Sequence, residues 1–438
     1  MISQNSPHKK HLRIGLFTDT FRPTTNGISV VVDTLRTHME ARGHEVFVVC
    51  SATRTAVPLL DSDDHILHVP SIKGWPYREY DISFFVPPRL RKRLLALNLD
   101  VIIFFTPGQL GLMAMDVARH ANIPVIAQHS TDLPEYVTQY ASGALAAVGV
   151  AVGLPFFAGF KVINRRALLA AIRPKFPITA WGRQMIEEGL AVWYGATDAT
   201  IALSRKSKRQ IEVMTPPRAK PYRIETIPVG LDALPLVGHS DFRQVHNIPA
   251  GAPMLMYVGR ISREKNLATI IPMMERVLRV MPAAYFVFVG DFDYRPTLEA
   301  MAAKSRAAGH IVFVGKLPRV ELGVAYAAAD VFVFPSITDT QGLVLHEAAQ
   351  AGLPIVAVDG EVTEVVKDGE NGFISENTAD ALATGVLAIL SDTKLRQRFA
   401  AHSKRIARRY SEAAQTDKLL AVMYDVIAQK SAKKQHDS

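Results

Sequence analysis

The chain has 438 residues, more than one hydrophobic core usually serves, so two domains are expected. Hydrophobic residues make up 48% and mean hydropathy is +0.11, which excludes a disordered chain. The net charge is +9, yet no C-x-x-C finger, aromatic RNA-binding motif or basic heptad accompanies it, which argues against a nucleic-acid partner. Cys50 is the only cysteine, so we expect a reducing compartment, and the N-terminus has no apolar segment typical of a signal peptide.

The first half alternates short apolar strands with amphipathic helices. Strands are expected at residues 13–18, 45–49, 100–105, 124–127 and 200–203. Helices are expected at 28–41 and 110–120, and a Pro/Gly loop at 22–27 precedes the first of them. This alternation predicts a parallel, doubly wound sheet.

A second series of the same kind follows the turn-rich stretch 228–251. Its strands are expected at 254–258, 285–289, 311–314, 331–334 and 354–358, with a helix at 267–280 that Pro272 would kink. The sequence therefore predicts an α/β fold of two Rossmann-like domains, 1–232 and 233–410, facing each other across a cleft. A C-terminal helix and tail, 411–438, would pack back on the first domain. Ligands of such sheets bind beyond the carboxyl ends of the strands.

Two cations, Arg260 and Lys265, follow the strand at 254–258 in the motif GRISREKN, immediately after Gly259. Each alone is common on an exposed loop. Combined with the helix described next, they predict a diphosphate site that needs no metal. Stabilising the charge of a departing diphosphate is a large catalytic effect, so losing either cation should cost about 3 kcal/mol in the chemical step.

The second motif, TDTQGLVLHE, begins a helix after the strand at 331–334. Gly342 allows phosphates to approach the first backbone N–H groups of that helix. Glu347, in the second turn, has apolar neighbours that favour an inward orientation and ribose binding, whereas His346 is expected to pack or face solvent. The donor-binding residues predicted here are Asp339, Gln341, Gly342, Leu343, Val344 and Glu347.

Two further strand ends carry candidates. The backbone of Lys316 and Leu317 is suited to reading the edge of a nucleobase. Asp291 and Asp293 form an Asp-x-Asp motif that can hold a metal with a nucleotide, but the diphosphate already has cationic partners here, so no metal or other cofactor is expected.

The motifs together resemble those of retaining glycosyltransferases of family 4, which have the GT-B fold. They are TDTFRPTTNGISVVVDTL, IIFFTPGQLGL, ATDATIALS, IPVGLD, YVGRISREKNL and ADVFVFPSITDTQGLVLHEAAQAGLPIV. The similarity is greatest to the lipid-directed branch, which includes diacylglycerol glycosyltransferases and phosphatidylinositol mannosyltransferases. Retention in this family is thought to proceed on one face of the sugar, with the diphosphate helping to deprotonate the acceptor.

The resemblance implies roles for particular residues. Arg260 and Lys265 match the diphosphate pair, and Glu347 matches the ribose-binding glutamate. Asp339 stands where the family usually has a longer glutamate that grips the donor sugar. Asn26 and Gly27 match the loop that approaches the phosphate and the acceptor.

The first domain departs from the family at its His-Thr-Asp motif. The chain reads Gln-His-Ser-Thr-Asp there, so either His129 reaches the transferred sugar through a bulge or Ser130 takes its place; a packed loop histidine is the other interpretation of His129. The acceptor-side candidates are Asp19, Ser130 and Asp132.

A membrane contact is expected within an insertion near 137–183. Residues 137–160 carry no charge and would form a helix about 36 Å long, and a basic cluster follows them. A monotopic or re-entrant segment on the cytoplasmic face of an anionic membrane and a buried helical hairpin all remain open. A second candidate contact is the basic and leucine-rich stretch 88–95, whose alternative is a solvated helix face.

Four functions follow. The first is transfer of a hexose from a nucleotide sugar, with UDP as the favoured nucleotide, to a lipid such as diacylglycerol or a glycolipid. The second is a GDP-mannose-dependent mannosyltransferase acting on phosphatidylinositol or a polyprenyl-linked acceptor. The third is a transferase with a soluble acceptor, which would not need the uncharged segment. The fourth is a catalytically dead nucleotide-sugar-binding or membrane-scaffold protein.

Overall fold

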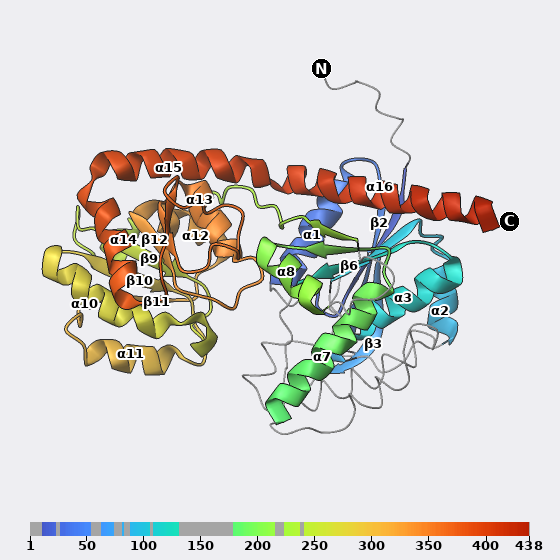
Figure 1. Cartoon of the computed structure of the whole chain (residues 1–438), viewed down its shortest axis with the longest axis horizontal. Coiled ribbons are helices and arrows are strands. Elements are labelled where there is room, and N and C mark those ends of the chain that lie inside the picture. Colours follow the sequence, from blue (N-terminus) through green and yellow to red (C-terminus); the bar gives the residue numbers. More distant parts are fainter. Residues whose placement is uncertain are drawn as a thin grey trace, which may run out of the picture. The chain divides into compact units, whose positions relative to one another are not determined.

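The computed structural model describes residues 11–22, 27–53, 63–73, 81–82, 88–105, 108–130, 178–214, 223–236 and 241–437. These fall into two compact units, which are described separately (Figure 1). Unit 1 comprises Met1–Leu203, Ser207–Ile227 and Gln415–Ser438, and unit 2 comprises Ser204–Lys206 and Pro228–Ala414. The predictions for Asn26, Asp132 and residues 137–177 lie outside the described residues.

Unit 1 is built on an eight-stranded sheet in the order β4-β3-β2-β1-β5-β6-β7-β8. All pairs are parallel except β3 with β4. The strands are β1 (Arg13–Thr18), β2 (Glu45–Thr53), β3 (Ile66–Lys73), β4 (Asp81–Ile82), β5 (Val101–Phe104), β6 (Val125–His129), β7 (Ala199–Ala202) and β8 (Ile224–Thr226). The predicted series ended at residue 203, whereas β8 adds a strand beyond it.

Helices pack around this sheet (Figure 1). They are α1 (Gly27–Glu40), α2 (Pro88–Leu95), α3 (Gln109–Ala121), α7 (Ile178–Gly195), α8 (Arg205–Met214) and α16 (Glu412–Asp437). The last of these returns the chain to unit 1, where Arg42 Nε lies 2.7 Å from Asp417 and Lys430 Nζ 3.4 Å from Asp198. No helix in the described ranges combines the length and apolar character that a membrane crossing requires.

Unit 2 is built on a six-stranded sheet in the order β11-β10-β9-β12-β13-β14, with every pair parallel. Its strands are β9 (Met254–Val258), β10 (Tyr285–Val289), β11 (Ile311–Gly315), β12 (Val331–Phe334), β13 (Ile355–Ala357) and β14 (Gly372–Ile374). Its helices are α9 (Phe242–Val245), η2 (Arg263–Lys265), η3 (Leu267–Thr269), α10 (Ile270–Val280), α11 (Arg295–Ala303), α12 (Arg319–Ala328), α13 (Leu343–Ala351), α14 (Ala379–Ser391), α15 (Thr393–Ala407) and η4 (Arg408–Tyr410).

The helix expected at 267–280 is divided rather than kinked. A 3₁₀ turn, η3, precedes α10, which begins at Ile270. Pro272 therefore lies in the first turn of α10, where its missing N–H costs no intrahelical hydrogen bond.

Each sheet reverses its strand order at one point. In unit 2 the reversal lies between β9 and β12, and in unit 1 it lies between β1 and β5. Parallel sheets bind ligands beyond the carboxyl ends of the strands at such a switch point. In unit 2 the loops there are 259–266 and 335–342, which contain both of the motifs singled out in the sequence.

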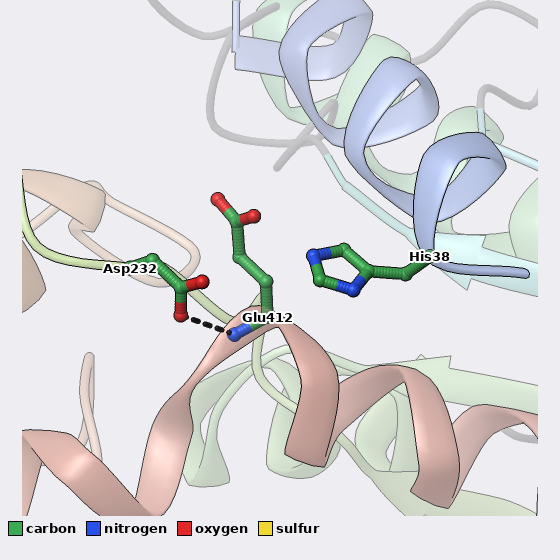
Figure 2. A group of neighbouring side chains, drawn as sticks. All are labelled: His38, Asp232 and Glu412. Carbon is green, nitrogen blue, oxygen red and sulfur yellow. Dashed lines mark hydrogen bonds between the residues drawn. The ribbon is translucent and has the colours of Figure 1, made fainter. Parts of the chain in front are cut away.

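The segment that opens unit 2, 228–232, is tightly held within that unit. Leu231 donates its N–H to Tyr410 O at 3.0 Å, and the Asp232 carboxylate accepts the N–H of Glu412 at 3.1 Å (Figure 2). A Cβ on Gly230 would lie 2.4 Å from Ser411 O, so only glycine fits there. These contacts account for the motif IPVGLD as a structural element.

Candidate functional site

Lys265 and Asp339 connect the two loops at the switch point of unit 2. Lys265 Nζ lies 2.7 Å from Asp339 Oδ1, and their side chains are only 12% and 21% exposed. Ser336 Oγ donates to the same carboxylate at 2.5 Å. Burial acts to raise the pKa of Asp339, but attraction to Lys265 and hydrogen bonds from Lys265 and Ser336 outweigh it, so this pKa lies below its usual value.

This pair changes one expectation. From the sequence, Arg260 and Lys265 were expected to bind only the donor diphosphate. In the structure, Asp339 of the neighbouring loop already balances the charge of Lys265. The loops are joined again by Thr338 Oγ1, which donates to Glu264 O at 3.2 Å, and by Asn266 Nδ2, which donates to Pro335 O at 3.2 Å.

Arg260 is exposed and lies over an aromatic ring. Its guanidinium carbon is 5.4 Å from the centroid of Phe292, in the loop after β10, and Phe292 is itself 37% exposed. Gly259, just before Arg260, has a φ of +145°, and a Cβ there would lie 2.8 Å from the hydroxyl of Tyr257. The positive φ of Gly259 sets the course of the backbone before Arg260, and the Phe292 ring contacts the Arg260 guanidinium.

The Asp-x-Asp motif lies in the same loop as Phe292. Asp291 Oδ1 accepts the N–H of Phe292 at 2.9 Å, and its other oxygen lies 3.6 Å from Arg295. Asp291 thus has partners within its own loop and helix.

The helix α13 begins as predicted. Gly342 has a φ of +64° and precedes Leu343, the first helical residue. The first N–H groups of a helix have no acceptor within it, so those of Leu343 and Val344 are suited to an anion.

Gln341 holds the segment that opens unit 2. Its side chain is 2% exposed and pairs with both backbone groups of Val229: Oε1 accepts the N–H at 2.8 Å, and Nε2 donates to the carbonyl at 2.9 Å. The side-chain amide therefore holds segment 228–232, and the predicted contact of Gln341 with the donor stays a prediction.

Glu347 faces inward and is 6% exposed. Its Oε1 lies 3.0 Å from Arg319 Nη1, and its Oε2 accepts the hydroxyl of Tyr326 at 2.9 Å. Burial raises the pKa of Glu347, and Arg319 and Tyr326 offset this only in part. Neither partner was singled out from the sequence, although they are seven residues apart and therefore lie on one face of a helix.

The ion pair between Arg319 and Glu347 lies next to Lys316 and Leu317, the residues predicted to read the nucleobase. Arg319 is the first residue of α12, and Lys316 and Leu317 occupy the short loop between β11 and that helix. Lys316 is exposed and Leu317 packs on the core of unit 2. Their loop is thus tied to α13 through Arg319 and Glu347.

His346 is a packing residue. It is 1% exposed, its Nε2 lies 3.3 Å from Gln341 Nε2, and its ring lies edge-on to Tyr410. Burial lowers the pKa of His346 to about 3, so the ring is neutral and can accept from the amide.

The first-unit candidates have structural partners. Asp19 Oδ1 accepts the N–H of Leu110 at 3.0 Å in the first turn of α3, and its predicted role on the acceptor side stays a prediction. His129 is 1% exposed at the end of β6, with Nδ1 2.5 Å from the hydroxyl of Tyr194, and Ser130 Oγ accepts from Gln128 Nε2 at 3.2 Å. The role of His129 or Ser130 at a sugar stays a prediction.

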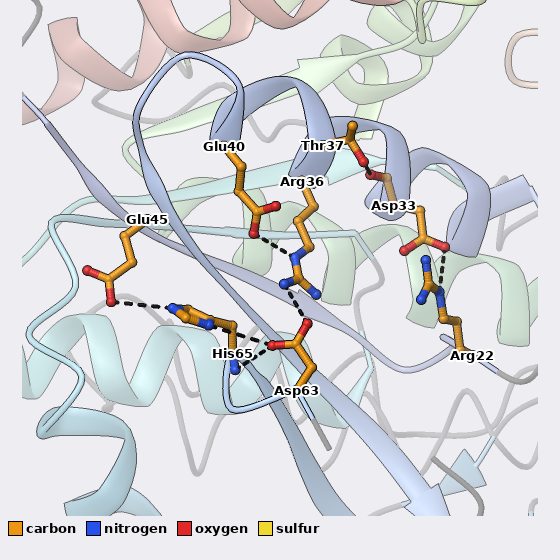
Figure 3. A network of polar contacts seen from close by, with 8 residues as sticks. All are labelled: Arg22, Asp33, Arg36, Thr37, Glu40, Glu45, Asp63 and His65. Carbon is orange, nitrogen blue, oxygen red and sulfur yellow. Dashed lines mark hydrogen bonds and ion pairs between the residues drawn. The ribbon is translucent and has the colours of Figure 1, made fainter. Parts of the chain in front are cut away.

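Gly27 begins α1, and ion pairs fix that helix. Figure 3 shows Arg36 between Glu40 and Asp63, at 2.8 and 2.6 Å, and Arg22 bound to Asp33 at 3.0 Å. Arg22 and Gly27 are the described residues on either side of 23–26, the segment that contains Asn26.

The leucines of α2 point to the core. Leu94 is fully buried, and Leu90 and Leu95 pack against the same cluster. Arg91 forms a 2.6 Å ion pair with Asp116 of α3. The exposed residues of the predicted membrane contact are therefore Pro88 and three basic residues, Arg89, Lys92 and Arg93.

Comparison with known proteins agrees with this arrangement. A family model for glycosyl transferases group 1 matches residues 239–406, and a model for glycosyltransferase family 4 matches residues 25–233. The chain belongs to these glycosyltransferases. The first model contains the whole switch point of unit 2, and the second contains most of unit 1.

Relatives and solved structures support the assignment. The glycosyltransferase is 26% identical over 349 residues to alpha-monoglucosyldiacylglycerol synthase of Streptococcus pneumoniae, covering 79% of this chain and 71% of the relative. It is 25% identical to a GDP-mannose-dependent alpha-mannosyltransferase of Mycolicibacterium smegmatis, covering 80% of each chain. The structure of Anabaena HepE in complex with UDP matches with a TM-score of 0.66 at 16% identity, covering 94% of this chain and 100% of that one. The fold is GT-B, as predicted.

Proposed function

We propose that this glycosyltransferase moves a hexose from a nucleotide sugar, with UDP as the favoured nucleotide, to a membrane lipid such as diacylglycerol or a glycolipid. The observation that carries the donor half is the convergence of Lys265, the start of α13 and Glu347 around the switch point of unit 2. The name of the pneumococcal relative supports a lipid acceptor.

The donor diphosphate would bind Arg260, Lys265 and the N-terminus of α13, with Glu347 accepting hydrogen bonds from the ribose hydroxyls. An arriving diphosphate competes with Asp339 for Lys265, because both are anions within reach of one ammonium group. As Lys265 turns to the phosphate, the Asp339 carboxylate becomes available to the sugar hydroxyls. The loop of Lys316 and Leu317 is proposed to read the base edge.

The transfer is proposed to retain configuration and to need no metal. The acceptor hydroxyl forms its bond to the anomeric carbon on the face that the diphosphate leaves, and its proton passes to a diphosphate oxygen. Two side-chain cations and a helix dipole supply the positive potential that a metal ion would otherwise provide. Full activity in EDTA, with the anomeric configuration of the product read by NMR, tests both features.

Membrane contact is proposed to be peripheral or monotopic, on the cytoplasmic face. Arg89, Lys92 and Arg93 of α2 are exposed and support attraction to anionic headgroups. A variant neutralised at these three positions should sediment less with anionic vesicles than the native chain does. With neutral vesicles, the variant and the native chain should sediment equally. Unchanged sedimentation would remove α2 from the proposal.

The function is tested by offering labelled UDP- and GDP-sugars with a total lipid extract and measuring the product masses. Labelled glycolipid from a UDP-hexose is the expected result. Mannolipid formed from GDP-mannose alone would favour the second candidate, which the mycobacterial relative supports. If the protein neither transferred sugar from any donor nor hydrolysed any donor, it would be a catalytically dead binding protein.

A further inference from the structure

Arg319 occupies a position that its own helix disfavours. It is the first residue of α12, where the partial positive charge of the helix dipole repels a cation. Its Nη1 lies 3.0 Å from Glu347 Oε1, on a different helix. The ion pair with α13 therefore accounts for an arginine at this point.

Tyr326 completes the arrangement from the same face of α12, two turns further on. Its hydroxyl donates to Glu347 Oε2 at 2.9 Å, and its side chain is fully buried. Each carboxylate oxygen of Glu347 thus has one protein donor. An ionised carboxylate offers about four acceptor positions, so two remain for hydroxyl groups of a ligand.

The charge state of Glu347 decides whether those positions exist. Burial disfavours its ionised form, and protonation would turn one acceptor oxygen into a donor. Arg319 and Tyr326 of α12 are the groups that act on it among the described residues. His346, its neighbour on α13, faces Gln341 and Tyr410, and Lys404 of α15 lies against Gly352, beyond the other end of α13.

We infer that Arg319 is a positioning residue that keeps Glu347 ionised and oriented to accept both ribose hydroxyls, and so confers preference for ribonucleotides over 2′-deoxyribonucleotides. This inference rests on the proposed donor binding. Arg319 is 45% exposed, which leaves its guanidinium accessible beside the carboxylate it orients.

Titration calorimetry from pH 5 to pH 8 tests the inference, with UDP against 2′-deoxy-UDP and GDP against 2′-deoxy-GDP. The native chain should prefer the ribonucleotide at pH 7. In Arg319→Gln this preference should fall at least fivefold at pH 7. When the pH is lowered, protonation of Glu347 should abolish the remaining ribonucleotide binding at a higher pH in the variant than in the native chain. Arg319→Lys keeps a cation, so it should restore much of the ribose preference and much of the native pH profile.

Tyr326→Phe removes one hydrogen bond and keeps the ring, so it gives a second variant if Arg319→Gln does not fold; it should lower the ribose preference in the same direction. Arg306→Gln, an exposed arginine of unit 2, is the matched control and should change nothing. Folded Arg319→Gln with the native ribose preference and pH profile would overturn the inference. A native chain that binds neither UDP nor GDP would instead overturn the proposed function.

Discussion

Lys265 and Asp339 form an ion pair, 2.7 Å from Nζ to Oδ1, across the switch point of unit 2. β9 and β12 are neighbouring parallel strands, so the loops that follow them meet at one edge of the sheet. The pair gives the loops a fixed geometry without a ligand, and it makes donor binding an exchange of one anion for another. The following predictions depend on this exchange and on the residues around it.

Asp339→Asn should reduce the acid sensitivity of the fold. The pKa of Asp339 in the folded chain lies below its usual 3.8, so its stabilising effect is present above that value and is lost as pH falls through the folded pKa. Urea unfolding between pH 2.5 and pH 6 should show a shallower decline of the unfolding free energy below about pH 4 in the variant. Asp293→Asn, at an exposed carboxylate, is the control; a variant decline as steep as the native one would contradict the prediction.

Phe292→Leu should weaken UDP binding about two- to fivefold, because an exposed cation–π contact is worth about 0.5–1 kcal/mol and Arg260 would lose its support. Binding of uridine, which lacks phosphates, should not change. Tyr294→Leu is the matched control, since it removes a similar contact from Arg263, which has no proposed donor role. If uridine binding fell equally, Phe292 would act on the base instead of on Arg260.

His346→Gln should flatten the pH dependence of stability between about pH 3 and pH 6.5. Burial lowers the pKa of His346 from 6.5 to about 3, so the unfolded chain takes up a proton in this window and the folded chain does not. As the pH is lowered through this window, this group should therefore reduce the unfolding free energy of the native chain by up to about 1.4 kcal/mol per pH unit. Equal slopes in the native chain and the variant would show that His346 titrates normally; His436→Gln, near the C-terminus, serves as the control.

Gln341→Leu should lower the thermal midpoint of unfolding. The change leaves the N–H and carbonyl of Val229 without the amide, and each unsatisfied buried group costs about 1–3 kcal/mol. Gln341→Glu keeps an acceptor for the N–H but buries a carboxylate against the carbonyl oxygen of Val229, so it should lower the midpoint as well. An unchanged midpoint in both variants would show that the clamp on Val229 is dispensable.

Regular patterns in the sequence were sufficient for the fold. The strand predicted at 254–258 is fully buried, and the strands at 285–289 and 331–334 also have the predicted bounds. β3 was missed because Pro70 and Lys73 break its apolar run, and β8 was missed because its three residues are only half-buried. Short edge strands depend on pairing with a neighbour, which local composition does not reveal.

Parts of the candidate site were predictable where local sequence alone indicates a conformation or an orientation, such as a glycine before a helix or a carboxylate among apolar neighbours. Gly342 and the inward Glu347 are of this kind. Partners from distant elements were not predictable: nothing local links Arg319 to Glu347, or Gln341 to Val229, 112 residues away. The hydrogen bond between Asp19 and the start of α3, 91 residues further along the chain, was likewise not predictable.

Turnover of the Lys265 variant tests the central claim most directly. At saturating donor, Lys265→Met should lower kcat by about a hundredfold or more, since charge stabilisation of the leaving diphosphate is worth about 3 kcal/mol. Lys265→Arg should retain part of the rate, and Lys304→Met, at an exposed lysine of unit 2, should retain all of it. Near-native kcat in folded Lys265→Met would contradict the account, because the diphosphate would then be stabilised elsewhere.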